Sequence, residues 1–167
     1  KRTAFVPSLV AVFVQIELDL DTGKYKILDL AAVADCGTIL HPQSFHHQMN
    51  GGAVWGIGMA TLERWVYDPR MGRPANRSIH QQKPPGWMDV SLDMKVDAVR
   101  IPDPQNPVGV RGMGEPIMGG TAAAILCAIS DALGGHYFYR HPVLPDMILN
   151  VVAGIAQPHK PLQVNTQ

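Results

Sequence analysis

The alternation of apolar and polar residues near the N-terminus predicts a β-hairpin. The second half of segment 9–20 alternates strictly, as a strand with one buried face does, and segment 25–34 has the length and composition of a second strand. Between them stands Asp21-Thr22-Gly23-Lys24, a tight turn in which Gly23 can supply a positive φ. We therefore expect these two segments to pair antiparallel.

Two later segments have the character of glycine-rich helices. The first is predicted over 45–65, with Ser44 as its N-cap, and the second runs from Pro116 to about residue 133. The first contains four glycines, although a glycine inside a helix costs about 1 kcal/mol relative to alanine. Such glycines indicate that something packs very close to the helix backbone. The partner is either a neighbouring helix or sheet, or a bound cofactor.

The remaining segments predict shorter elements. Segment 67–90 is rich in proline and reads as irregular, whereas 89–101 alternates like a further strand. Segment 137–139 is a candidate short strand, and a last helix over 147–155 is opened by Pro145-Asp146. We predict an α+β fold over residues 1–156, with an antiparallel hairpin and further strands packed against two glycine-rich helices. Residues 157–167 are expected to form an extended tail.

The charge balance excludes several kinds of partner. Lys and Arg number 14, as do Asp and Glu, so the formal net charge is +0. This argues against nucleic-acid binding, which needs clustered cations, and against a polybasic membrane anchor. The longest apolar stretch, 117–133, is interrupted by polar residues and is short for a membrane span of ~20 residues. Charged residues make up only 17% of the chain, against a typical ~25%, so we expect a partner chain to cover part of its surface.

Two cysteines are too few for a disulfide framework. Cys36 and Cys127 both lie in apolar runs, and we expect two buried thiols in a reducing, cytoplasmic compartment. The N-terminus lacks the pattern of a signal peptide and begins without Met. We therefore expect a trimmed or processed chain, or a piece of a larger protein.

The loop before the second glycine-rich helix is the most unusual place for chemistry. Glu115 follows Gly112-Met113-Gly114 and is the only carboxylate between Asp103 and Asp131. It has two interpretations: a partner for the helix N-terminus, worth ~0.3–1 kcal/mol, or a catalytic carboxylate. Gln48, beside two glycines, is a second candidate, although a glutamine on a helix is more often simply solvated.

Other familiar site patterns are missing. His46 and His47 are adjacent, so on a helix their side chains point about 100° apart, and neither they nor His41 has a Cys or carboxylate at the spacing of a ligand set. A histidine-based metal site is therefore disfavoured. No glycine fingerprint follows a strand, no P-loop lysine is present, and no GxSxG motif supports a serine hydrolase.

Four motifs, taken in order, resemble a known family. They are Val-Ala-Asp-Cys-Gly-Thr-Ile-Leu-His-Pro, Gln-Met-Asn-Gly-Gly-Ala-Val-Trp-Gly-Ile-Gly, Tyr-Asp-Pro-Arg-Met-Gly-Arg and Gly-Val-Arg-Gly-Met-Gly-Glu-Pro. Over roughly residues 9–150 the chain resembles the C-terminal part of the molybdenum-binding subunit of the xanthine dehydrogenase/aldehyde oxidase family. It departs from the family pattern at Asn50, where Glu is usual, and at His41, which replaces the Asn before Pro42.

The resemblance implies roles for particular residues. Glu115 aligns with the family's catalytic base, which takes the proton of the hydroxyl group that attacks an electrophilic carbon of the substrate. Gln48 aligns with a glutamine that contacts the cofactor, and the backbone of Gly112, Met113 and Gly114 would line the pocket. The implied reaction is hydroxylation of an N-heterocycle or aldehyde with oxygen derived from water. No side chain of this chain is expected to ligate the metal.

The resemblance also implies cofactors and partners. The expected cofactor is molybdenum–molybdopterin in its cytosine dinucleotide form, with 2Fe-2S clusters and FAD on partner chains. The family subunit is several times longer than this chain, which also lacks a cysteine pattern for an iron–sulfur cluster. We therefore expect activity only in a multi-chain complex that supplies the rest of the molybdenum subunit. Two alternatives are a non-catalytic assembly module with Glu115 as a helix cap, and a family member that reduces an aromatic thioester.

Overall fold

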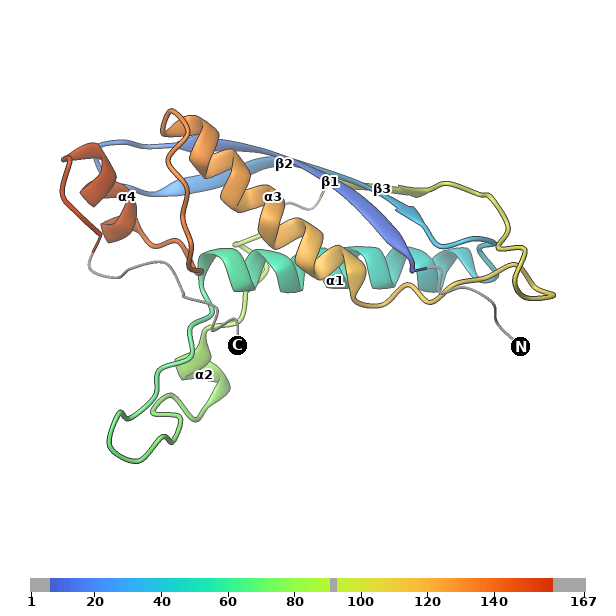
Figure 1. Cartoon of the computed structure of the whole chain (residues 1–167), viewed down its shortest axis with the longest axis horizontal. Helices are drawn as coiled ribbons and strands as arrows, with labels where there is room; N and C mark the ends of the chain where they lie inside the picture. Colours follow the sequence, from blue (N-terminus) through green and yellow to red (C-terminus); the bar gives the residue numbers. More distant parts are fainter. Residues whose placement is uncertain (1–6, 91–92, 158–167) are drawn as a thin grey trace, which may run out of the picture.

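The computed structural model describes residues 7–90 and 93–157. Within these ranges the chain forms a three-stranded sheet and four helices, arranged as an α+β domain (Figure 1). The elements, in order, are β1 (Leu9–Leu18), β2 (Tyr25–Asp35), α1 (Pro42–Thr61), α2 (Ile79–Gln82), β3 (Met94–Ala98), α3 (Pro116–Ala132) and α4 (Pro145–Val152).

The predicted hairpin is confirmed. β1 and β2 pair antiparallel from Leu9 opposite Asp35 to Leu18 opposite Tyr25, with one irregularity between Gln15 and Ile16. Gly23 in the connecting turn has a φ of 69°, a conformation that glycine adopts without steric cost. β3 then pairs with the other edge of β2 in the parallel direction, so the sheet is mixed and has the order β1-β2-β3.

Both glycine-rich helices pack against this sheet, as the sequence predicts, and they lie on the same face of it (Figure 1). α3 lies against β1 and crosses α1, while α1 also reaches β3 (Figure 1). Gly120 permits the close approach of α3, because a Cβ atom there would lie 3.0 Å from Val10 and Val12. The core between the layers contains side chains with almost no exposed surface, among them Leu30, Met49, Ile57, Ile117, Ile125 and Ile129.

The predicted bounds of α1 are wrong at both ends. The helix begins at Pro42 rather than Phe45, because the fixed φ of proline suits the first helical position. Its N-cap is His41, not Ser44: the His41 Nδ1 accepts a hydrogen bond of 3.0 Å from the backbone N–H of Ser44. The helix ends at Thr61, four residues before the predicted Trp65.

Other predicted elements need correction as well. The strand expected over 89–101 forms only at Met94–Ala98; residues 91–92 lie outside the described residues. Segment 137–139 forms no strand, and α4 occupies Pro145–Val152 rather than 147–155. The irregular character of 67–90 is confirmed apart from the short α2, and this segment extends away from the body (Figure 1). Nearly all of the tail predicted over 157–167 lies outside the described residues.

The two cysteines differ, against expectation. Cys36 is buried, but Cys127 is exposed. On α3 the buried positions Thr121, Ile125 and Ile129 recur every four residues, so Cys127 falls on the opposite side of the helix. The apolar run around Cys127 therefore does not indicate burial. Among the described residues, no helix combines the length and apolar character that crossing a membrane requires.

Candidate functional site

Glu115 lies where the glycine-rich loop meets the start of α3. It occupies the N-cap position with φ −106° and ψ −22°, and Pro116 follows as the first helical residue. Its backbone carbonyl accepts a hydrogen bond from the Met118 N–H at 3.0 Å, but its side chain makes no capping hydrogen bond. The side chain is exposed. The carboxylate therefore does not cap the helix by hydrogen bonding and is open to other partners.

Gln48 lies beside this loop. Its Oε1 atom is 3.7 Å from the point where a Cβ atom of Gly114 would stand. The two motifs meet because Gly52, one turn further along α1, has no side chain: a Cβ there would overlap Ile117 Cγ2 and lie 3.4 Å from the Gly114 carbonyl oxygen. The structure thus brings together Gln48, Gly114 and the residue that follows it, Glu115.

Two glycines on the exposed side of this site have no role in internal packing. A Cβ atom at Gly51 or Gly112 would meet nothing within 4 Å, and neither residue has a positive φ. Gly51 stands three positions after Gln48 on α1, so both residues face the same side of the helix. The result is an open surface of backbone and one amide side chain beside the Glu115 loop.

Met113 contributes differently from its neighbours. Its side chain is half-buried against the core and lines a shallow pocket of about 190 Å³ together with Cys36, Phe45 and Val110. The structure therefore places the side chain of Met113 in packing. Only its backbone remains as a possible part of the open surface.

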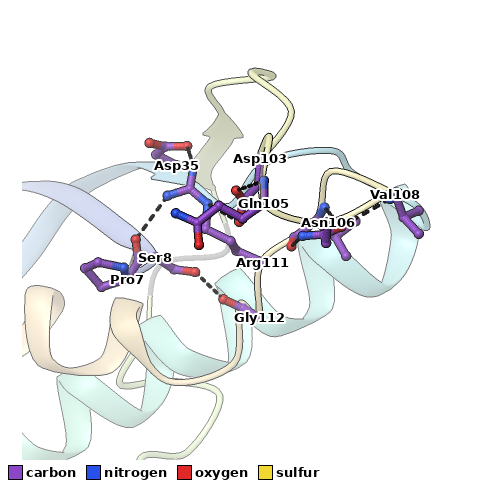
Figure 2. A network of polar contacts seen from close by, with 10 residues as sticks. Pro7, Ser8, Asp35, Asp103, Gln105, Asn106, Val108, Arg111 and Gly112 are labelled. Carbon is purple, nitrogen blue, oxygen red and sulfur yellow. Dashed lines mark hydrogen bonds and ion pairs between the residues drawn. The ribbon is translucent and has the colours of Figure 1, made fainter. Parts of the chain in front are cut away.

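Arg111 organises the base of the loop, a role that the sequence analysis missed (Figure 2). Its side chain is only 9% exposed, and its Nη2 donates to Asp35 Oδ1 at 2.7 Å. Its Nη1 donates to the Pro7 carbonyl at 3.0 Å, and its Nε lies 3.9 Å from Oδ2 of the buried Asp103. The one feature of the sequence that could have indicated this role is that Arg111 is an isolated charge among glycines and apolar residues.

Backbone hydrogen bonds hold the same loop to the end of β2. The Arg111 N–H donates to the Cys36 carbonyl, and the Thr38 N–H donates to the Gly109 carbonyl, both at 2.7 Å. The Ser8 hydroxyl donates to the Gly112 carbonyl at 2.5 Å (Figure 2). The chain entering Gly112 is therefore fixed from two sides.

The electrostatics next to this anchor keep Cys36 in its thiol form. Burial raises the pKa of the Cys36 thiol above its ordinary value, the charge of Asp35 raises it further, and the nearby Arg111 opposes both effects. A buried thiol with a raised pKa is a poor nucleophile and a poor metal ligand. Cys36 is therefore a packing residue.

The polar groups at the site suit an organic cofactor better than a bare metal ion. Among the described residues, no three His, Cys, Asp or Glu side chains gather closely enough to hold a metal. What the site offers is the Gln48 amide, the Glu115 carboxylate, and backbone groups that glycines leave approachable. An amide and backbone N–H groups recognise a ligand rich in hydrogen-bonding atoms, and a metal brought by such a ligand needs no protein side chain.

The fold and this surface define an α+β domain with an open, glycine-lined surface where two glycine-rich helices meet. Comparison with known families makes the class specific: a family described as the molybdopterin cofactor-binding domain matches residues 2–91, which are 90 of the 167 residues. The chain belongs to this family. The matched region includes Gln48 and ends before the Glu115 loop.

Similarity to individual proteins extends beyond the matched segment and covers most of the chain. The nicotine 6-hydroxylase large subunit of Paenarthrobacter nicotinovorans is 34% identical over 142 residues, covering 84% of this chain and 17% of the relative. The xanthine dehydrogenase molybdenum-binding subunit of Escherichia coli O157:H7 is 32% identical over 134 residues, covering 80% of this chain and 18% of the relative.

A solved structure shows the same fold. Quinoline 2-oxidoreductase from Pseudomonas putida 86 superimposes with a TM-score of 0.77 at 30% identity, over 84% of this chain and 18% of its own. The chain therefore spans less than a fifth of the length of these similar proteins.

Proposed function

We propose that this chain is part of a molybdenum-dependent oxidoreductase that hydroxylates an N-heterocycle or an aldehyde with oxygen derived from water. Glu115 is its catalytic base. The observation that carries the proposal is the meeting of Gln48 with the Gly114-Glu115 loop at an open, glycine-lined surface. Support for the substrate class comes from relatives named for nicotine and quinoline, both N-heterocycles.

Gln48 and the loop backbone have separate proposed roles in binding the cofactor. The Gln48 amide can both donate and accept, and so it binds a polar edge of the molybdopterin cofactor. The backbone of Gly112, Met113 and Gly114 lies alongside the bound group, where added side chains would stand in the way. The cofactor, expected in its cytosine dinucleotide form, supplies the metal and the path by which electrons leave the substrate.

Glu115 supplies the proton acceptor. A general base must come within hydrogen-bond reach of the proton that it removes. The Glu115 carboxylate makes no capping bond and follows Gly114, so an incoming group can approach it closely. In the proposed reaction it accepts the proton of the hydroxyl group that attacks the substrate carbon, which makes the oxygen a stronger nucleophile.

Partner chains complete the enzyme. The chain spans less than a fifth of the length of its relatives. The remaining segments of the molybdenum subunit, together with 2Fe-2S and FAD partner chains, are proposed to complete the enzyme. Large exposed apolar side chains, such as Trp87 at 85% and Met88 at 97% exposed, support coverage by a partner. Both cysteines are free thiols, which supports a reducing, cytoplasmic location.

The test is Glu115→Gln in the natively purified complex. We expect molybdenum content to stay unchanged, while turnover of N-heterocycles and aldehydes falls by about 10²–10⁴-fold, the typical contribution of a general base. Glu17→Gln, the same change at an exposed position on β1, is the matched control and should leave turnover unchanged.

Three results would count against the proposal. Normal turnover in Glu115→Gln removes the base role. A wild-type complex that contains no molybdenum favours a non-catalytic assembly module. Molybdenum-dependent reduction of an aromatic thioester, without hydroxylation, assigns the chain to the reductive branch of the family.

A further inference from the structure

Three segments far apart in sequence meet at one guanidinium group. Arg111 contacts the Pro7 carbonyl before β1, Asp35 at the end of β2, and Asp103 in the loop after β3 (Figure 2). Arg111 and Pro7 are 104 residues apart, and Arg111 and Asp35 are 76 apart. The planar group, with donors pointing in several directions, is suited to binding several acceptors at once.

The environment makes this contact set more than a surface ion pair. The Arg111 side chain is 9% exposed and that of Asp103 is 1% exposed. A buried carboxylate needs a compensating cation or several hydrogen bonds, and Arg111 is the cation that lies beside it. The Asp103 Oδ1 also accepts the Gln105 N–H at 2.9 Å, which fixes the carboxylate itself.

Arg111 stands immediately before the residues that carry the proposed chemistry. Glu115 comes four positions after Arg111, and two of the three residues between them are glycines, which restrict the backbone least. α3 fixes the far end of this loop at Pro116. The near end is fixed by Arg111, through its side chain and its backbone N–H to Cys36.

We propose that Arg111 is a positioning residue for Glu115: its guanidinium, held by Asp35, Asp103 and Pro7, fixes the start of the Gly112–Glu115 loop and thereby the place of the carboxylate. This rests on the proposed role of Glu115 as the base. A displacement of about 1 Å in a reacting group can cost about 10²-fold in rate, so a loosened anchor should lower turnover without removing the base.

The chain offers a matched control in the same region. Arg100 also pairs with an aspartate, Asp97, at 3.5 Å, but both side chains are more than 70% exposed. Exposed ion pairs contribute little to structure. Arg100→Lys therefore makes the same chemical change as Arg111→Lys without touching the buried network.

The experiment compares Arg111→Lys with Arg100→Lys in the assembled complex. A lysine keeps the charge, but a single ammonium group cannot reach Asp35, Asp103 and Pro7 together. The first readout, hydrogen exchange by mass spectrometry, does not depend on the cofactor. We expect peptides that cover 109–116 to exchange at least about 10-fold faster in Arg111→Lys, with peptides of β1 and β2 unchanged.

The second readout is kinetic. We expect kcat to fall by about 10–100-fold in Arg111→Lys, with KM and molybdenum content unchanged, whereas Arg100→Lys behaves like the wild type. If Arg111→Lys fails to assemble, the double variant Arg111→Gln/Asp103→Asn removes the buried carboxylate charge together with the cation and is measured in the same way.

Each outcome decides the proposal. Unchanged exchange over 109–116 overturns it, as does faster exchange spread over β1, β2 and α3, which would indicate a general loss of stability. Faster local exchange with unchanged kcat also overturns it. Normal turnover in Glu115→Gln, by contrast, rejects the base role while the exchange result still reports whether Arg111 fixes the loop.

Discussion

Neighbouring glycines at the meeting point of α1 and α3 have opposite surroundings. A Cβ atom at Gly56 would lie 2.5 Å from the Met118 carbonyl oxygen and 2.7 Å from Thr121 Cβ, and one at Gly52 would overlap Ile117. A Cβ atom at Gly51 or Gly112 would meet nothing. Glycine is required at positions 52 and 56 for the helices to cross. No contact within the described chain requires glycine at positions 51 and 112.

Within one motif, Gly52 is needed for the packing of the fold, whereas Gly51 is assigned to the proposed function. Gly51 and Gly52 are adjacent, yet only Gly52 faces the other helix. An exposed glycine in a helix is unfavourable by itself, and no packing contact among the described residues requires glycine at position 51. We attribute Gly51 to the bound cofactor, in line with the proposed function.

The largest effect is expected for Gly56→Ala. Because the methyl group would meet backbone atoms that cannot rotate away, α1 and α3 must separate, and the free energy of unfolding should fall by about 1–3 kcal/mol. Chemical denaturation followed by circular dichroism measures this. Gly86→Ala, in an exposed loop where a Cβ finds only an ordinary 3.5 Å contact with Asp89, is the control. Equal stability of Gly56→Ala and the wild type would contradict the claim that glycine is required at position 56 for the helices to cross.

Gly51→Ala should act in the opposite direction. Replacing an exposed helical glycine that has free space around it should stabilise the domain by up to about 1 kcal/mol. The same methyl group should lower the molybdenum content of the purified complex, because it stands on the face that carries Gln48. A stabilised variant with full molybdenum content would show that this face does not approach the cofactor.

Gly112→Ala should leave stability within about 0.5 kcal/mol of the wild type, as for most exposed positions, while lowering molybdenum retention during dialysis. Gly86→Ala makes the same change at another loop glycine. A loss of molybdenum seen only in Gly112→Ala is therefore due to the position of the residue and not to the replacement of glycine by alanine. A clear loss of stability in Gly112→Ala would show that Gly112 is needed for packing, as Gly52 and Gly56 are.

The smallest effect is expected at Glu63, whose side chain folds back over α1 towards Gly58 and is partly buried. A Cβ atom at Gly58 would meet the end of the Glu63 side chain and the ring of Pro85. Burial raises the pKa of Glu63 above its ordinary value of 4.5. The folded state therefore disfavours ionisation, and the wild type loses stability as the pH rises from below 4.5 through the raised pKa.

Glu63→Gln removes this ionisation. We expect the variant to be slightly more stable than the wild type at pH 7 and closer to it at pH 4. Parallel denaturation curves at the two pH values measure the difference. A difference that is larger at pH 4 than at pH 7 would reverse the sign and contradict the partial burial of this carboxylate.

Local patterns in the sequence were sufficient for some elements and not for others. The hairpin follows from alternation and from Gly23, both of which act over a few residues. The extent of β3 does not, because the alternating pattern of 89–101 continues beyond the part of β2 with which it pairs, Leu30–Ala34. The start of α1 depended on reading Pro42 as the first helical residue rather than as the end of a loop.

The candidate site shows the same division. Gln48 and Glu115 could be singled out because each stands beside glycines, and the order of the motifs joined them through the family resemblance. Their roles stay predictions. The Arg111 network could not be found in this way, since its members are joined only by the folded chain and each is unremarkable in its own segment.

The crossing of α1 and α3 also bears on where the unit of cooperative folding ends. The family match stops at residue 91, but Ile117, Ile125 and Ile129 of α3 are fully buried in the same core as Met49 of α1. A polypeptide cut at residue 91 would leave the inner face of the hairpin and of α1 in contact with water. The segment that matches the family is therefore smaller than the packed core to which it contributes.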